Sequence, residues 1–144
     1  MATLSPSEAI RLGKMRPTKS ELMLIDLMRD YSSLRKWLFA NSIPPVEEVL
    51  LKFLPRNEIA RLSGFDDNET DGLCSFGKIT ASIPCPKSIL LSDDLSVRET
   101  RMTLIHEMAH MKVDIEFQRP MGHGKKWQKE MKRLARLGAF ENWW

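Results

Sequence analysis

Two histidines stand four residues apart in the segment LIHEMAHMKV, and a glutamate directly follows the first of them. One helical turn separates His106 from His110, so both imidazoles project from the same face and could bind one metal ion. Glu107 is rotated from that face by about 100° but stays beside it, where a carboxylate can take a proton from a metal-bound water. The pattern H-E-x-x-H therefore indicates zinc-dependent hydrolysis.

The same pattern also occurs by chance, because two histidines can be satisfied core residues of a helix. This helix is apolar on most sides, so the polar side chains inside it are costly unless a group such as zinc satisfies them. The chain has three histidines, and the third, His123, lies between glycines in MGHGKKW. Catalytic zinc usually has three protein ligands and a water, so we predict one zinc ion per chain on His106, His110 and His123.

Three carboxylates are alternative third ligands. Asp114 shares the face of His110, but on a straight helix it lies too far along to reach a metal between the two histidines. Glu116 stands where a metzincin has its third histidine, and Val113 replaces the glycine of that pattern, which excludes a metzincin. Glu130 could act like the downstream glutamate of thermolysin-like enzymes, but its surroundings lack the E-x-x-x-D signature. The third histidine remains the preferred ligand.

Capping signals mark the helices that position these residues. Ser96 and Glu99 form a capping box at the start of the helix that carries the histidine pattern. Thr18 and Glu21 give the same signal for an amphipathic helix predicted from Thr18 to about Ala40. Two long helices are therefore predicted, one near the start of the chain and one at the metal site.

The segments between these helices differ in character. IPPVEEVLLKFLP starts with prolines and stops at Pro55, which predicts a second, short helix. NEIARLS, GLCSFGKITASI and SILLSD are short and rich in β-branched or aromatic residues, which predicts a small antiparallel sheet of about three strands. Helices packed on such a sheet form an α+β fold. We expect residues 1–17 to be a loose arm and residues 18–144 a single domain.

A last helix is predicted after the third histidine, with Trp127, Met131 and Leu134 on one face and Gly138 as its C-terminal cap. Its other side is basic, and such a block can contact nucleic-acid phosphates or form a solvated helix face. These tentative nucleic-acid contacts are Lys125, Lys126, Lys129, Lys132, Arg133 and Arg136.

The composition is that of a soluble globular protein, with 42% hydrophobic and 28% charged residues in 144. No apolar run approaches the roughly 20 residues that span a bilayer, and the first residues lack the apolar core of a secretory signal. We therefore expect a cytoplasmic protein without a membrane partner. Cys74 and Cys85 are expected to be free thiols; their spacing indicates neither a disulfide nor a share in a site.

The segments TLIHEMAHMKV and GHGKKWQKEMKRL resemble the SprT-like zinc metallopeptidases. That family has H-E-x-x-H on a helix and, after a short stretch, H-G before an aromatic residue and a basic helix. GLCSFGK and SILLSDDL fit its small sheet, so the resemblance covers roughly residues 59–137. It implies a zincin-like minimal metalloprotease core, with His106, His110 and His123 as zinc ligands and Glu107 as catalytic base.

The resemblance also implies protein or peptide substrates, often proteins bound to or crosslinked with DNA. Many family members continue into a zinc ribbon or another DNA-binding module, whereas this chain ends soon after the catalytic core. The basic helix would then have to bind DNA, weakly and without sequence preference, or a partner would. A stand-alone core this short would suit a phage or mobile-element protein.

Three functions compete at this point. The first is a zinc endopeptidase, and the second is a non-catalytic zinc-stabilised module that binds DNA or protein. Glu107 counts against the second, because a structural site needs no base. The third is a regulatory protein that binds a partner, through the ENWW end of the chain. No oxyanion-stabilising residue is visible, since no histidine is spare and Tyr31, the one tyrosine, is expected in the core.

Overall fold

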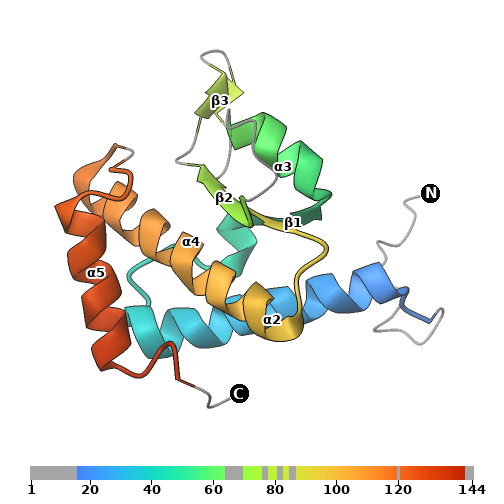
Figure 1. Ribbon diagram of the computed structural model, residues 1–144, viewed down its shortest axis with the longest axis horizontal. Coiled ribbons are helices and arrows are strands. Elements are labelled where there is room, and N and C mark those ends of the chain that lie inside the picture. The colour runs from blue at the N-terminus through green and yellow to red at the C-terminus, as the bar shows by residue number, and fades with distance from the viewer. Residues whose placement is uncertain are drawn as a thin grey trace.

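The computed structural model describes residues 16–63, 70–75, 78–80, 83–84, 87–119 and 121–141 of the 144-residue chain. Most of the predicted arm, Cys85 and the end of the ENWW segment lie outside these ranges. In the described part, helices pack around a small three-stranded sheet, so the predicted α+β fold is confirmed (Figure 1). The elements are α2 (Lys19–Phe39), a 3-10 turn (Val46–Glu48), β1 (Val49–Leu54), α3 (Arg56–Ser63), β2 (Gly72–Ser75), β3 (Lys78–Thr80), β4 (Ile83–Pro84), β5 (Lys87–Ser92), α4 (Val97–Phe117) and α5 (Lys125–Arg136).

The sheet has the strand order β1-β5-β2 and is mixed rather than antiparallel. Strand β2 runs antiparallel to β5, with Cys74 opposite Ile89, but β1 runs parallel to β5, with Leu51 opposite the same residue. The prediction of an antiparallel sheet was therefore wrong for one of the two pairings. Between β1 and β5 the chain forms α3, β2, β3 and β4. A parallel pairing needs such a long crossover, and it has no local sequence signal.

Two predicted elements have the opposite type in the structure. IPPVEEVLLKFLP, predicted as a helix, forms only the 3-10 turn before strand β1. In β1, buried Val49 and Leu51 alternate with exposed Leu50, which is the period of a strand. NEIARLS, predicted as a strand, forms helix α3 and buries Ile59 and Ala60. Both runs are short, and periodicity does not separate a short apolar helix from a strand.

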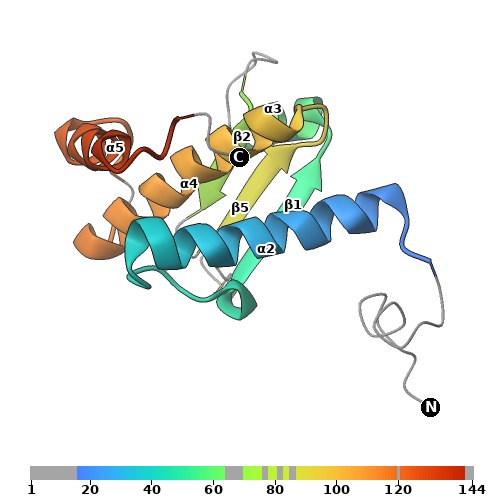
Figure 2. The same cartoon turned by 90° about the horizontal axis from the view of Figure 1, so that it is seen from below.

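The helices cover the sheet on both sides. Helices α2 and α4 lie on one side and α3 on the other, while α5 lies against α4 away from the sheet (Figures 1 and 2). The core lies between the sheet, α2 and α4, and Leu134 joins it from α5. Tyr31 is fully buried in this core, as predicted, and its hydroxyl donates to the Pro44 carbonyl at 2.6 Å. Burial raises the pKa of this phenol well above its usual value.

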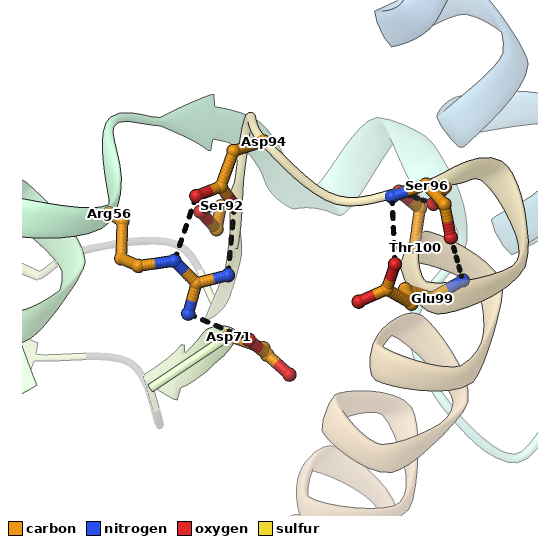
Figure 3. A network of polar contacts seen from close by, with 7 residues as sticks. All are labelled: Arg56, Asp71, Ser92, Asp94, Ser96, Glu99 and Thr100. Atoms are coloured by element: carbon orange, nitrogen blue, oxygen red, sulfur yellow. Dashed lines mark hydrogen bonds and ion pairs between the residues drawn. The ribbon is translucent and has the colours of Figure 1, made fainter. Parts of the chain in front are cut away.

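The predicted helix ends are confirmed. The Thr18 side chain accepts the Glu21 N–H at the start of α2, and Ser96 and Glu99 form a complete capping box at the start of α4 (Figure 3). Gly138 has a φ of +80° after α5, and its N–H donates to the Ala135 carbonyl. These bonds occupy backbone groups that a helix end leaves without intrahelical partners.

An arginine at the start of α3 ties two ends of the sheet together. The Arg56 guanidinium contacts Asp71, just before β2, at 2.8 Å and Asp94, just after β5, at 2.9 Å (Figure 3). Ser92 donates a further hydrogen bond to Asp94, and the hydrogen bonds from Arg56 and Ser92 lower the pKa of that carboxyl to about 2. The network fixes the position at which the chain enters β2, the strand beside the histidines.

Candidate metal centre

The Nε2 atoms of His106, His110 and His123 form a small triangle. His110 Nε2 lies 3.2 Å from His106 Nε2 and 3.0 Å from His123 Nε2, and the remaining side is 3.4 Å. Zinc–nitrogen bonds of about 2.0–2.1 Å at tetrahedral angles place two ligand nitrogens about 3.3–3.4 Å apart. The donor set therefore fits a zinc ion in both chemistry and spacing.

The triangle is built from one helix and one turn. His106 and His110 are half-buried on α4, one helical turn apart, and His123 is exposed on the connection between α4 and α5. Gly122 beside it has a φ of +62°, and Gly124 is the N-cap of α5. These three side chains are the ligands predicted from the sequence, and the structure brings them together.

The unprotonated imidazole is the form that binds a metal, and the local environment favours it. Burial, and then the neighbouring imidazoles of His106 and His123, lower the pKa of His110 to about 3. Burial, and then His123, also lower the pKa of His106. At neutral pH both side chains are therefore neutral and ready to act as ligands.

Glu107 lies beside the triangle but is buried, with 5% of the residue exposed. One of its carboxylate oxygens, Oε1, is 3.9 Å from His106 Nε2. Burial, and then the charge of Asp114, raise the pKa of Glu107 to about 8. A cation at the triangle would favour the carboxylate form, so metal binding and ionisation of Glu107 would support one another.

A cleft of about 570 Å³ opens onto the triangle and Glu107. Its walls come from the residues before and within β2, from α4, and from the turn that carries His123. Cys74 of β2 is on this wall, and burial followed by the charge of Glu107 raises the pKa of its thiol. Within the described part of the chain, β2 has β5 as its only sheet neighbour, and Gly72, Leu73 and Cys74 of β2 line the cleft.

Sequence reasoning did not place Trp127 at this centre. It predicted Trp127 on the inner face of the last helix, but the indole also contacts all three histidine rings. The indole is stacked on His110 with an angle of 17° and a centroid distance of 5.1 Å, and it meets His123 edge-on at 4.6 Å. The available signal was its spacing of four residues from His123, which places it in the first turn of α5. The Trp127 ring therefore lies against all three imidazoles.

The other candidate ligands do not join the triangle, although Asp114 lines the same cleft. Glu116 is exposed, and Asp114 is buried and accepts the Met121 N–H at 2.9 Å. Glu130 is buried between Lys112 and Arg133, which both donate to its carboxylate. None of these carboxylates belongs to the group that could hold a metal.

The predicted basic surface divides into two kinds of residue. Arg133 is half-buried, donates to Glu130 Oε1 at 2.9 Å and to the Leu38 carbonyl at 2.8 Å, and lies over the Phe39 ring. It therefore joins α5 to α4 and α2. The exposed members of the set are Lys125, Lys126, Lys129, Lys132 and Arg136.

The model of the SprT-like family matches residues 63–142, which is more than half of the chain. The matched segment contains β2, α4 and α5, and with them all three histidines and Glu107. No curated protein and no solved structure matches the chain. Among the described helices, none has the length and apolar character needed to cross a membrane.

Proposed function

Because the chain belongs to the SprT-like family, we propose that it is a zinc-dependent metallopeptidase that hydrolyses peptide bonds in protein substrates. One observation carries the proposal. Three imidazole nitrogens converge at 3.0–3.4 Å from one another, and the buried Glu107 carboxylate lies directly beside them. Three metal ligands with an adjacent carboxylate base are the groups that hydrolysis needs, whereas a purely structural site needs no base.

His106, His110 and His123 would hold the metal. A bound zinc ion would act as a Lewis acid and lower the pKa of a coordinated water to about 7. Structural zinc sites use four protein ligands, whereas catalytic sites use three and keep one position open. The described residues supply three ligands beside an open cleft, which supports the catalytic use over the zinc-stabilised binding module.

Glu107 would accept a proton from the attacking water and pass it to the amine that leaves. Its burial suits this task, because a carboxylate in a poorly solvated site is a stronger base than one in water. The Trp127 ring, which contacts all three imidazoles, would help to keep them in place. No described side chain is assigned to the oxyanion.

A protein substrate would enter as an extended segment. Among the described residues, β2 has no strand on its outer edge, and its residues line the cleft; an extended peptide can add to an exposed sheet edge through main-chain hydrogen bonds. Such binding is largely independent of the substrate's side chains, but it needs an extended main chain. We therefore propose flexible or locally unfolded protein segments as the substrate class.

DNA is the second partner that we propose, for the exposed lysines of α5. Lys125 and Lys126 follow His123 almost directly, so DNA bound there would bring its attached proteins near the cleft. Contacts to phosphates alone give non-specific affinities of about 10⁻⁴ to 10⁻⁶ M. This role is independent of the peptidase chemistry.

The test is incubation of the zinc-loaded protein with a mixed protein substrate, with and without DNA, followed by fragment analysis. Cleavage that is lost on chelation and in Glu107→Gln is the expected result. A protein that binds zinc but leaves every substrate intact would favour the non-catalytic zinc module instead.

A further inference from the structure

The third histidine stands on the least packed part of the metal centre. His123 is exposed, and the glycines on both sides of it have no side chains to anchor the turn. A Cβ built on Gly122 would find no atom within 4 Å, so no neighbour packs closely against that position. Yet the His123 Nε2 atom lies 3.0 Å from His110 Nε2. The Trp127 ring meets this imidazole edge-on, but the backbone of the turn must be held by other contacts.

Asp114 fixes the first half of this connection. Its backbone carbonyl accepts the Arg119 N–H at 3.1 Å, which closes the end of α4, and its side-chain Oδ1 accepts the Met121 N–H at 2.9 Å. Asp114 is 6% exposed, and hydrogen bonds to a buried carboxylate are among the stronger ones. The Asp114 side chain therefore joins the end of α4 to the start of the turn.

Gln128 fixes the second half from the opposite side. Its side-chain Nε2 donates to the His123 carbonyl at 3.1 Å, while its backbone N–H makes the first helical bond of α5 to Gly124. The Gln128 side chain is exposed to solvent, so its bond is weaker than the one made by Asp114. The turn is thus held at its start by α4 and at its histidine by α5.

We propose that Asp114 and Gln128 are positioning residues of the metal centre, whose hydrogen bonds to the Met121 amide and the His123 carbonyl present the His123 imidazole to the other two. The inference rests on the proposed zinc function. Neither residue belongs to the ligand group, so each acts through the turn. Loss of groups that orient metal ligands commonly weakens metal binding about 10- to 100-fold.

The test compares zinc affinity, measured by competition with a chelating dye, in four variants. Asp114→Leu removes the acceptor and should weaken zinc binding about 10- to 100-fold. Asp114→Asn keeps an acceptor oxygen without the charge and should stay close to the wild type. Gln128→Leu should weaken binding less than Asp114→Leu. Glu116→Gln is the matched control, because it removes an exposed carboxylate from the same end of α4 and should change nothing.

Two further readouts separate positioning from general destabilisation. The visible absorption of the cobalt(II)-loaded protein should change in Asp114→Leu, since it reports the ligand geometry, but not in Asp114→Asn. In the metal-free wild type, hydrogen exchange at the Met121 amide should be slow, and Asp114→Leu should accelerate it. If Asp114→Leu does not fold, the exchange rate of the Met121 amide in the wild type and the zinc affinity of Gln128→Leu still test the proposal.

Equal loss of affinity in Asp114→Asn and Asp114→Leu would overturn the proposal, because the charge rather than the hydrogen bond would then matter. So would unchanged affinity in Asp114→Leu, unchanged affinity in Gln128→Leu, or fast exchange at Met121 in the wild type. Failure of the wild type to bind zinc would instead refute the proposed function, while Met121 exchange in that metal-free protein would still report on the contact.

Discussion

Replacement of Arg133 by methionine should destabilise the protein far more than loss of any exposed basic residue of α5. The Arg133 guanidinium donates to Glu130, which is 6% exposed, and to the Leu38 carbonyl. Removing one partner of a buried ion pair typically costs about 3–5 kcal/mol. Lys112 still contacts Glu130 in the variant, and Arg133 is itself partly exposed, so we place the loss near the lower end, at about 3 kcal/mol.

Urea unfolding of the metal-free protein measures this loss. Lys132→Met is the matched control, because it removes the same charge from the neighbouring, exposed position and should change stability by no more than about 0.5 kcal/mol. The double variant Glu130→Met with Arg133→Met should be more stable than Arg133→Met alone, because it removes the buried carboxylate that Arg133→Met leaves with Lys112 as its one remaining ion-pair partner among the described residues. Equal losses in Arg133→Met and Lys132→Met would refute the reasoning.

The effect should also depend on pH. Burial alone would raise the pKa of Glu130, but hydrogen bonds from Arg133 and Lys112 bring it below its ordinary value. A carboxyl whose folded-state pKa is lowered contributes stability above its unfolded-state pKa and loses that contribution as the pH falls through the folded-state value. The difference in free energy of unfolding between wild type and Arg133→Met should therefore be largest near neutral pH and shrink below about pH 4.

Three further predictions concern metal, chemistry and DNA. The purified protein should hold about one zinc per chain, and His123→Ala should clearly lower the zinc content measured by atomic emission; full occupancy in that variant would remove His123 from the ligand set. Glu107→Gln should retain zinc and lose about 10² to 10⁴ in proteolytic rate, and unchanged proteolysis would place the activity elsewhere or in a contaminant. Fluorescence anisotropy should show weak DNA binding whose log–log salt slope is about −0.7 per phosphate contact on single strands. Lys129→Glu with Lys132→Glu should reduce that slope, and Arg133 is left out because its change would disturb the fold; binding identical to wild type would make these lysines a solvated surface.

Local signals account for what could be predicted of the fold. The capping residues Thr18 and Ser96 mark helix starts within a few residues, so α2 and α4 begin where the sequence predicts them. The strands are different, because each is short and its identity depends on its neighbours in space. The parallel pairing of Val49 with Lys87 joins residues far apart in sequence, and neither segment has a sequence feature that identifies its partner strand.

The candidate site divides in the same way. His106, Glu107 and His110 share one helical turn, so their mutual placement follows from helix geometry. The residues that support them, such as Trp127, lie on α5, and their contacts depend on how α5 packs against α4. That packing is a tertiary property that neither helix specifies alone.

The packing of α5 on α4 therefore links stability to metal binding. Glu130 of α5 contacts Lys112 of α4, in the turn after His110, and Arg133 carries the same connection on to α2. A metal on the triangle would join α4 to the turn before α5 and so stabilise the same pair of helices. At a zinc concentration of 100 times the dissociation constant, this stabilisation amounts to about 2.7 kcal/mol. That is close to the loss expected for Arg133→Met, so excess zinc should largely restore the unfolding midpoint of this variant. A variant that zinc does not restore would show that the contacts of Arg133 are needed to form the metal centre itself.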